Sequence, residues 1–545
     1  MIKREILCET DYIHIPIIPN LPRDSRNELQ IWVNGELFLS PKLALTDEGG
    51  SFFFLDVKKF KGNVITFLVP KPNNITDKSL SRICSGEDCT PDNPLYSDLY
   101  KEALRPAFHF SSRRGWLNDP NGLVYKDGIY HMYYQHNPFG TPHGDVNISW
   151  GHAISTDLLH WKEKNDAIRP WRRDWFIASG SAVVDYENRA GYGKDAIIAA
   201  FTVLGTSNVD TLKSGYPSGG QFLAASLDDG ETFFRFSHEP TVQTFQGKGW
   251  RDPRLFRYEE HYVMAVYETN ESDSNCVSFY VSDDFHKWRK TSSNSDLYEC
   301  PDIFKLQIEG EEESKWVLYG ADGLARIGDF DGYHFIESGL KNPLDYGNAT
   351  YAGQTWSHHP EKKVVHTSWV RGMGGEGEDL GFEDMAFSQC MTIPAEITLR
   401  RFKDGLRVCR APITEVETLA NNLLHKEIIK NEAESVLHHS NPAYYKISLS
   451  DIKENIDIRS GKHTIRYSPK NGVISFENAC TVKLNKSNLH FSVLVDTTTV
   501  EFCFENSIMV TYTMPPQDIN LIVKGESVIT YDCYKVDNIW FPKEK

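Results

Sequence analysis

The sequence predicts an all-β protein: a five-bladed β-propeller followed by a C-terminal β-sandwich, with an extra small N-terminal β domain. Three observations carry this prediction. Aromatic residues make up 12% of the chain and long alanine- and leucine-rich runs are scarce, which favours strands over helices. Strand-like runs recur along the middle of the chain, and most are followed by a Ser/Asp turn leading to an aromatic residue. Such a repeat, at intervals of roughly 50 to 70 residues, is typical of propeller blades.

Residues 1–95 are predicted to form a β-rich module with its linker. Apolar and polar residues alternate in "ELQIWVNGELFLS", "SFFFLDV" and "NVITFLVP", and Asn-Gly and proline mark the turns between these runs. The polar stretch "KPNNITDKSLSRICSGEDCTPDNP" that follows has the composition of a linker.

Residues 106–410 carry the propeller repeat. The strand-like runs are "GIYHMYYQHNP", "DAIIAAFTVLG", "HYVMAVYETN", "KWVLYGADG" and "KVVHTSWVRG". The turn and its aromatic appear in "STDLLHWKE", "SLDDGETFFRF", "SDDFHKWRK" and "IGDFDGYHF". Five runs predict five blades. A generic all-β sandwich is the alternative, but the strand and the turn repeat together, which favours the propeller.

The last part of the chain, residues 420–545, is predicted to be a separate β-sandwich. The stretch "ETLANNLLHKEII" ahead of it is compatible with a short helix or a linker strand. Alternating strands then resume in "AYYKISLS", "GKHTIRYSP", "LHFSVLVDTTTVEFCFE" and "SIMVTYT".

Charge and composition narrow the classes of function. The formal net charge of −17 argues against nucleic acid and gives no reason to expect a membrane as partner. The first 20 residues contain no apolar stretch long enough for a signal peptide, so we expect a cytoplasmic protein unless a signal was removed. The 10 cysteines show no CxxC pairs or His/Cys clusters, so we expect no metal, and most thiols free. We also expect no cofactor.

Three carboxylates stand out as candidates for catalysis. Asp119 lies in "GWLNDPNG", Asp252 in "GWRDPRLF" and Glu299 in "YECPDIF". Each has a proline one or two residues further on, which is expected to keep the backbone of the acid extended. A propeller gathers its inner strands around one axis, so acids this far apart in sequence can face one another.

The surroundings of these acids suggest a division of roles. Arg251 is expected to hold the neighbouring Asp252 ionised, because an adjacent positive charge favours the charged form. Glu299 lies between Tyr298 and Cys300, whose low polarity favours the neutral carboxyl that a general acid needs. One ionised and one protonated carboxyl are what a retaining glycosidase uses.

The three motifs, in this order along one chain, resemble the signature blocks of glycoside hydrolase family 32. Supporting blocks are "YYQHNP" at 133–138, "SWGHAISTDLLHW" at 149–161, "SGSAV" at 179–183, "YAGQTW" at 351–356 and "SQCMTIPAEITLR" at 388–400. The family contains invertases, inulinases, levanases and fructosyltransferases. The N-terminal β domain resembles an extra module found ahead of the catalytic part in some bacterial fructan hydrolases.

The resemblance implies roles for individual residues. Asp119 would be the nucleophile on the anomeric carbon of fructose, Glu299 the general acid/base and Asp252 the transition-state stabiliser. The Asn-Asp-Pro-Asn-Gly segment is expected to be a turn that aims Asp119 along the propeller axis. The residues expected to bind the sugar are Asn118, Gln135, Trp116, Ser179 and Arg251. For Gln135 and Ser179, capping of strands is the alternative.

Two positions depart from the family pattern. Asp145 and its neighbours stand where many relatives carry Trp-Gly-Asn, and Ala178 stands where a phenylalanine usually precedes Ser-Gly-Ser. Loss of two aromatics should widen the site on the leaving-group side. An oligofructan substrate or an unusual acceptor is therefore expected ahead of compact sucrose recognition.

The expected function is a retaining β-fructofuranosidase acting on fructo-oligosaccharides, inulin, levan or sucrose. A fructosyltransferase, including one that forms difructose anhydrides, is the nearest alternative because it would use the same three acids. A non-catalytic fructan-binding protein and an interaction scaffold are further alternatives. The expected partner is a carbohydrate, and either the sandwich or the N-terminal module could support a homodimer.

Overall fold

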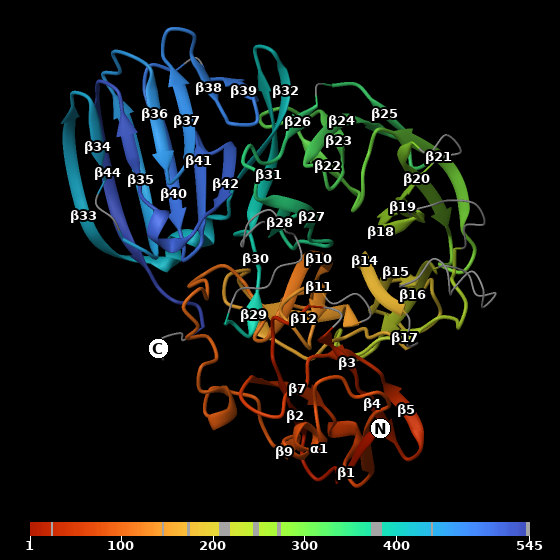
Figure 1. The fold of residues 1–545 in the computed structure, drawn as a ribbon. Helices are drawn as coiled ribbons and strands as arrows, with labels where there is room; N and C mark the ends of the chain where they lie inside the picture. The colour runs from red at the N-terminus through yellow and green to blue at the C-terminus, as the bar shows by residue number, and fades with distance from the viewer. Residues whose placement is uncertain are drawn as a thin grey trace.

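The protein is described here from a computed structural model, which is built almost wholly of β-strands (Figure 1). The described residues are 1–22, 25–143, 147–171, 175–205, 219–242, 250–269, 274–339, 341–371, 384–437, 440–484 and 486–540. Within them no helix is both long and apolar enough to cross a membrane. The predicted all-β class is confirmed.

Five sheets, antiparallel except for one short parallel pair in the first, follow one another along the described part of residues 115–412, arranged as blades (Figure 1). The first contains β10 (Gly115–Lys126), β11 (Ile129–Asn137), β12 (Ser149–Ser155), β13 (Lys162–Glu163) and β29 (Phe387–Ser388). The second contains β14 (Trp175–Asp185), β15 (Ala196–Gly205), β16 (Gly219–Ser226) and β17 (Phe234–Arg235). The third contains β18 (Arg251–Tyr258), β19 (His261–Thr269), β20 (Asn275–Ser282) and β21 (Arg289–Ser295).

The fourth sheet contains β22 (Asp302–Gln307), β23 (Ser314–Tyr319), β24 (Leu324–Phe330), β25 (Phe335–Glu337) and β26 (Asn342–Pro343). The fifth contains β27 (Thr350–Thr355), β28 (Val364–Val370), β30 (Cys390–Met391), β31 (Ala395–Phe402) and β32 (Gly405–Pro412). β29 comes from late in the chain yet pairs with β10 of the first sheet, which ties the two ends of the ring together.

The turn that repeats in the sequence is the link between the third and fourth strands of four of these sheets. In each, an aspartate side chain accepts backbone N–H groups of the following residues, as in an Asx turn. The acceptors are Asp157, Asp228, Asp284 and Asp331. The carboxylate fixes the reversal and an aromatic after it packs on the sheet, so the same short motif recurs in these four sheets.

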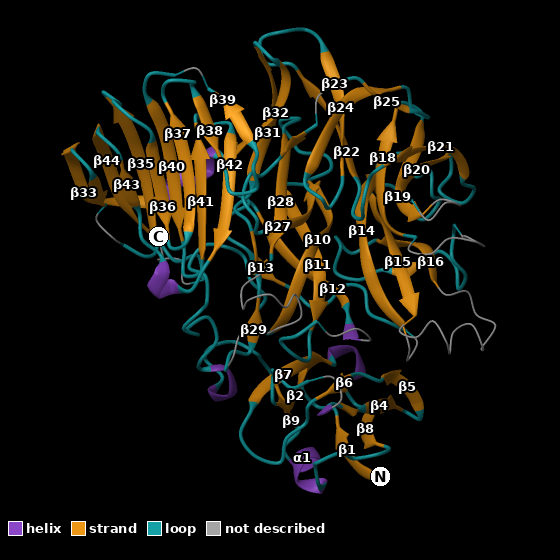
Figure 2. Ribbon diagram, turned by 45° about the horizontal axis from the view of Figure 1, so that its top comes forward, coloured by secondary structure: helices purple, strands orange, loops and turns teal. Residues whose placement is uncertain are grey.

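Two six-stranded sheets form the C-terminal sandwich (Figures 1 and 2). One has the order β33 (Ala420–Asn431), β44 (Ser527–Val536), β35 (Ala443–Ser450), β40 (Leu489–Val495), β41 (Thr499–Phe504) and β42 (Ile508–Thr513). The other has the order β34 (Glu434–Val436), β43 (Ile522–Lys524), β36 (Ile456–Ser460), β37 (His463–Ser468), β38 (Val473–Ser475) and β39 (Thr481–Lys483). The stretch "ETLANNLLHKEII" contains the end of a 3₁₀ helix, Thr414–Leu419, followed by most of β33.

The N-terminal module has a core of its own and packs against the first blade (Figure 2). Its main sheet has the order β1 (Ile2–Leu7), β8 (Val64–Val69), β4 (Gln30–Val33) and β5 (Glu36–Leu39). A second sheet has the order β7 (Ser51–Asp56), β2 (Tyr12–Ile17) and β9 (Cys84–Gly86), and a short pair joins β3 (Asn27–Glu28) to β6 (Lys42–Leu43).

The linker prediction for residues 71–94 is wrong. This segment forms the helix α1 (Asp77–Ser81) and β9, and β9 pairs with β2. Just beyond it, the buried Tyr96 hydroxyl hydrogen-bonds His14 Nδ1 at 2.7 Å. The polar composition of residues 71–94 gave no sign of these few anchoring contacts. The predicted domain boundaries themselves stay a prediction.

A buried charge cluster joins the propeller to the sandwich. His109 Nδ1 lies 2.8 Å from Asp496 Oδ2, and His109 Nε2 lies 3.7 Å from Glu501 Oε2. Asp496 also accepts the backbone N–H groups of residues 107–109. Burial alone would lower the pKa of His109, but hydrogen bonds and attraction to the two carboxylates outweigh it and raise this pKa to about 9.

We expect His109→Gln to lower the Tm by several degrees, because it leaves two buried carboxylates without their cation, a loss on the order of 3–5 kcal/mol. The His109 pKa is raised above its ordinary 6.5, so its stabilisation is present below pH 6.5 and is lost as pH rises through about 9. Thermal unfolding between pH 6 and pH 10 should show this loss in the parent protein and not in the variant. His334→Gln, at an exposed histidine, is the control. Equal pH profiles for parent and His109→Gln would contradict the assignment.

Candidate active site

The innermost strands carry bulges near their first residues. The register shifts between Leu117 and Pro120 in β10, Ile177 and Gly180 in β14, Arg251 and Arg254 in β18, and Tyr351 and Gln354 in β27. A bulge adds one residue, bends the strand and re-aims a side chain. Asp119, Ser179 and Asp252 all lie in such bulges, so the distortion that interrupts pairing also presents the candidate site residues.

The segment around Asp119 is therefore not the turn that we expected. Residues Gly115–Lys126 form one strand, β10, with a second register shift between Asn121 and Val124. Gly122 has φ +54°, and a Cβ there would lie 2.8 Å from the Tyr133 ring, so the position needs glycine. The Pro-Asn-Gly sequence marks bulges within a strand rather than its end.

Asp119 accepts hydrogen bonds on both carboxylate oxygens. Ser179 Oγ donates to Oδ2 at 2.6 Å, and Asn118 Nδ2 donates to Oδ1 at 3.1 Å. The Cys300 thiol lies 3.5 Å from Oδ2. Burial raises the pKa of Asp119, and these three donors partly offset that effect by favouring the charged form.

Asp252 is buried next to two other acids. Its backbone N–H donates to Thr202 Oγ1 at 2.9 Å, and its Oδ2 accepts from the Cys300 N–H at 3.1 Å. Burial raises the pKa of Asp252 to about 7, helped by the Glu299 and Asp119 charges and opposed by Arg251. The expectation that Arg251 keeps Asp252 ionised is therefore wrong, because desolvation outweighs the adjacent cation.

Arg251, which we expected to pair with Asp252, instead donates a hydrogen bond to Glu299. Arg251 Nη2 donates to Glu299 Oε1, and the Tyr351 hydroxyl donates to Oε2. The Arg251 Nε stays 3.6 Å from Asp252 Oδ2, and its guanidinium lies 4.7 Å from the centroid of the Tyr267 ring. Polar donors, rather than the apolar sequence neighbours, thus surround the Glu299 carboxylate.

The backbone at two of the three acids is left-handed. Asp252 has φ +63°, Glu299 φ +42° and Cys300 φ +39°. The prediction of extended backbone is wrong for Asp252 and Glu299. Such conformations are costly for residues other than glycine and persist where surrounding contacts fix them. Here the contacts are two hydrogen bonds: the Asp252 N–H donates to Thr202 Oγ1, and the Cys300 N–H donates to Asp252 Oδ2.

Comparison with known proteins bears on this cluster. Residues 109–412 match the model of the glycosyl hydrolases family 32 N-terminal domain, and these residues include all three acids. This chain belongs to glycosyl hydrolase family 32. Like its relatives, it combines the matched propeller region with a C-terminal sandwich.

Relatives in family 32 include fructan hydrolases. A levanase from Bacillus subtilis is 32% identical over 349 residues, which are 59% of this chain and 49% of the levanase. An extracellular exo-inulinase from Aspergillus ficuum is 30% identical over 357 residues, which are 57% of this chain and 65% of the inulinase. The chain thus matches less than two thirds of the length of either relative.

Solved structures show the same fold. The exo-inulinase of Aspergillus awamori superposes with a TM-score of 0.70 at 24% sequence identity, covering 81% of this chain and 100% of that one. A β-fructofuranosidase from Schwanniomyces occidentalis in complex with fructosyl-erythritol gives 0.64 at 21% identity, covering 79% of this chain and 98% of that one.

Trp116 and Gln135 lie beside the bulge of β10 that carries Asp119. Only 1% of Trp116 is exposed, and its indole N–H donates to Asn118 Oδ1 at 2.9 Å. Trp116 thus acts on Asp119 through Asn118. Gln135 is 3% exposed, and its Nε2 has no hydrogen-bond partner among the described residues. It lies opposite the first bulge of β10, so a ligand hydroxyl at Asp119 would offer the missing acceptor.

Sequence reasoning missed several contacts of the cluster. Tyr351 stood in a quoted motif without a role, and Cys300 was considered only as a low-polarity neighbour of Glu299, not as a contact of Asp119 and Asp252. Beneath the site, Arg254 Nε lies 2.8 Å from Asp302 Oδ1, and both side chains are buried. These two residues come from the same "WRDPRLF" and "ECPDIF" motifs as Asp252 and Glu299. The recurrence of charged pairs within the motifs was the signal that could have revealed them.

Among the described residues, no group of three or more His, Cys, Asp or Glu is arranged to hold a metal ion. All 10 cysteines are free. Ala178 is buried in the bulge of β14, with its carbonyl accepting from the Trp150 indole N–H at 3.0 Å. Asp145, the other departure from the family 32 pattern, lies outside the described residues.

We expect Asp252→Asn to stabilise this family 32 protein at neutral pH. The folded-state pKa of about 7 lies above the ordinary 3.8, so the free energy of unfolding falls as pH rises from about 4 to about 7. The neutral amide avoids that loss. The variant should gain stability on the order of 1–3 kcal/mol at pH 8 and lose this advantage near pH 4.

Thermal unfolding of parent and variant at the two pH values measures this difference. Asp329→Asn, at an exposed carboxylate, is the matched control. Destabilisation of Asp252→Asn at pH 8 would contradict the raised pKa.

Proposed function

We propose that this chain is a retaining β-fructofuranosidase of broad fructan-hydrolase type. The observation that carries the proposal is the meeting of three carboxylates from different blades: the Cys300 thiol lies 3.5 Å from both Asp119 and Asp252, and Glu299 is its sequence neighbour. The names of the relatives, levanase and exo-inulinase, support fructans as substrates.

In the proposed reaction, Glu299 protonates the glycosidic oxygen while the Asp119 carboxylate attacks the anomeric carbon of fructose. The bond to the leaving sugar breaks as the bond to Asp119 forms, which gives a covalent fructosyl-enzyme. Glu299 then takes a proton from water, whose oxygen displaces Asp119. Fructose leaves with its configuration kept, and both carboxyl groups return to their starting states.

The donors around the acids fit these steps. Ser179 and Asn118 hold the Asp119 carboxylate in one orientation, which keeps it preorganised for attack. In the proposed reaction Asp252 accepts fructose hydroxyls and, in its ionised form, stabilises the developing positive charge. Arg251 donates a hydrogen bond to Glu299. A sugar hydroxyl that accepts from Arg251 would release Glu299 to take up the proton that it must donate.

The proposed sugar-binding residues belong to the same cluster. We propose that Gln135, Asn118 and Ser179 contact the fructosyl unit directly, with Trp116 fixing Asn118. Ala178 presents a small side chain on the leaving-group side, which leaves room for an oligosaccharide. This arrangement favours fructo-oligosaccharides, inulin or levan over sucrose.

Incubation with sucrose, inulin and levan, followed by separation of the products, tests the proposal. Release of free fructose as the main product supports hydrolysis. Longer fructosides or difructose anhydrides would instead show that a sugar hydroxyl reaches the intermediate, the fructosyltransferase alternative. Binding of a fructan without any product would show a non-catalytic binding protein.

A further inference from the structure

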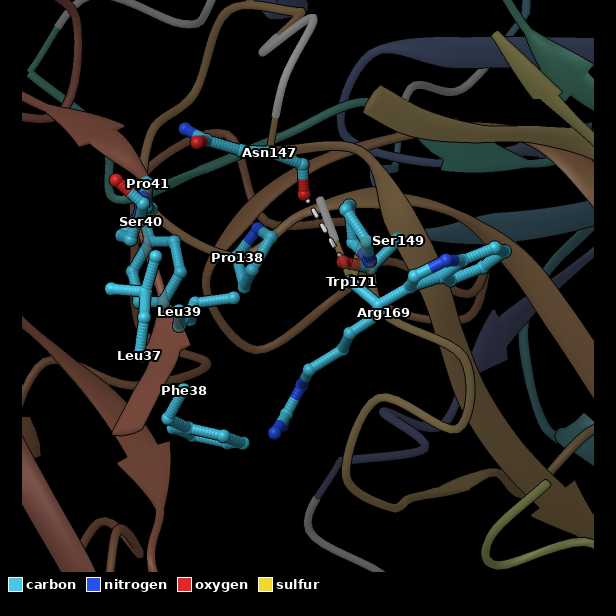
Figure 3. Close-up of a pocket in the computed structure, with 12 residues that line it drawn as sticks. Leu37, Phe38, Leu39, Ser40, Pro41, Pro138, Asn147, Ser149, Arg169 and Trp171 are labelled. Atoms are coloured by element: carbon cyan, nitrogen blue, oxygen red, sulfur yellow. Dashed lines mark hydrogen bonds between the residues drawn. The ribbon is translucent and has the colours of Figure 1, made fainter. Parts of the chain in front are cut away.

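We propose that the N-terminal module forms, together with the propeller, a second carbohydrate subsite that binds a fructosyl unit remote from the cleaved bond. This inference rests on the proposed function and extends it. The candidate subsite is a pocket between the two domains (Figure 3). One wall is β5 of the N-terminal module, and the other is formed by residues 169–171 of the propeller, which follow β13.

The N-terminal module is fixed at the end of the propeller where the bulges lie. The N–H of Gly115, the first residue of β10, donates to the Ala386 carbonyl at 2.7 Å, and Ala386 packs in the core of the N-terminal module. Phe139, just after β11, packs in the same core. Asp119 is only four residues from Gly115, so the module stands beside the end of β10 that carries the nucleophile.

Hydrogen bonds hold the two walls of the pocket in register. Asn147 Oδ1 accepts from the Lys42 N–H at 3.0 Å, and Asn147 Nδ2 donates to the Lys42 carbonyl at 2.7 Å. The Thr141 N–H donates to the Pro19 carbonyl at 3.0 Å. These contacts involve buried propeller side chains and module backbone, so the pocket is a built feature and not a chance gap between loosely joined domains.

Buried strand residues link the floor of the pocket to the candidate active site. Asn147 and Ser149 line the pocket at the start of β12. The next residue, Trp150, pairs with Gln135 on one side and donates its indole N–H to the Ala178 carbonyl on the other. Ser179, which follows Ala178, donates to Asp119. One strand therefore connects the pocket to both the predicted sugar-binding Gln135 and the Ser179 bulge.

The chemistry of the walls suits a sugar. Leu37 and the half-buried Phe38 offer apolar surface from β5. Trp171 lines the facing wall, but its indole packs against Trp175 and Phe222 and points away from Phe38 (Figure 3). Arg169 extends across the pocket towards Phe38 (Figure 3), and its Nε makes a long contact of 3.6 Å with Asp166. Aromatic rings pack on the C–H groups of a sugar while guanidinium N–H groups donate to its hydroxyls. A neutral polyol chain matches this mixture.

A fructan chain is the occupant that the position favours. Its far units must leave the active site past the bulged ends of the inner strands, and the N-terminal module stands at that end. Each further fructosyl unit extends the reach of the substrate away from the cleaved bond, so the pocket should matter more as the substrate grows longer.

The test is the ratio of kcat/KM on long inulin to kcat/KM on sucrose. Phe38→Ala and Arg169→Gln remove one contact from each wall. We expect each to lower this ratio about 3- to 10-fold, mainly through KM on inulin, the loss of one aromatic or hydrogen-bonding contact. Leu7→Ala, at an exposed residue of β1 in the same module, is the control and should leave the ratio as in the parent.

Binding measured without turnover provides a second readout. In the Asp119→Asn background, migration of the protein through gels containing inulin or levan should be retarded, and Phe38→Ala should reduce the retardation. An unchanged ratio and unchanged retardation in both wall variants would overturn the inference. A change of oligomeric state in Phe38→Ala, with no chain-length effect, would also overturn it and make the pocket an interface between copies of the chain.

The two proposals fail in different ways. A parent protein that cleaves no fructoside but is still retarded by inulin through Phe38 would contradict the hydrolase proposal and leave the subsite standing. A parent protein that cleaves inulin and sucrose, with wall variants that keep the parental ratio, would contradict only the subsite.

Discussion

Replacing Asp119 by asparagine is expected to abolish turnover while leaving the fold intact. The amide cannot attack the anomeric carbon, so kcat on any fructoside should fall by a factor of about 10⁴ or more, roughly 5.5 kcal/mol of transition-state stabilisation. Its oxygen can still accept the hydrogen bond from Ser179 Oγ. Burial raises the pKa of Asp119, so the neutral amide should cost no stability.

Steady-state rates on inulin and sucrose, with thermal unfolding of the same samples, measure both parts of this expectation. Asp329→Asn makes the same chemical change at an exposed site and should keep parental activity. Ordinary turnover in Asp119→Asn, with its fold confirmed, would remove Asp119 as the nucleophile.

Glu299→Gln is expected to separate substrates by their leaving groups. Loss of the general acid should lower kcat/KM on sucrose or inulin by roughly 10²- to 10⁴-fold, because a sugar alkoxide leaves poorly without a proton. Fructosyl fluoride needs no such proton, so formation of the fructosyl-enzyme from it should be nearly unaffected. Its hydrolysis should remain slow, since the variant lacks the base that activates water.

Pre-steady-state release of fluoride, followed by the slow steady rate, measures the two steps separately. Glu260→Gln, at an exposed glutamate of the same propeller, is the matched control. Equal losses on fructosyl fluoride and sucrose would place the general acid elsewhere.

From the sequence we could predict which acids lie together, but not their backbone conformations or their hydrogen-bond partners. The fold class followed from strand patterns and from a turn whose Asx hydrogen bonds the structure shows at Asp157, Asp284 and Asp331. The three acids could be singled out because each lies in a distinctive motif. Their shared cluster could be expected because a propeller brings its inner strands to one axis.

Backbone geometry at the acids could not be inferred from local sequence. Proline one or two residues on suggested extended conformations, but Asp252 and Glu299 are left-handed. Contacts from distant segments fix this geometry, namely Thr202 from β15 and the mutual contact of Cys300 with Asp252. Local preference gives way where tertiary hydrogen bonds and bulges determine φ.

The sequence also predicted the wrong hydrogen-bond partner for Arg251, for a related reason. Arg251 is adjacent to Asp252 in sequence, yet its Nη2 donates to Glu299, which is 48 residues away. The bulge at Asp252 re-aims its carboxylate, so Arg251 Nε stays 3.6 Å from it and adjacency in sequence did not decide the hydrogen-bond partner. The linker prediction failed because single anchors such as Tyr96 carry no periodic signal.

Trapping the covalent intermediate tests the central claim most directly. Glu299→Gln incubated with fructosyl fluoride, quenched in acid and digested, should yield one peptide heavier by a single fructosyl unit, with the modification on Asp119. Fragmentation of that peptide locates the carboxylate. An adduct on Asp252 or on any other residue, or turnover of fructosyl fluoride with an inverted product and no adduct, would contradict the account.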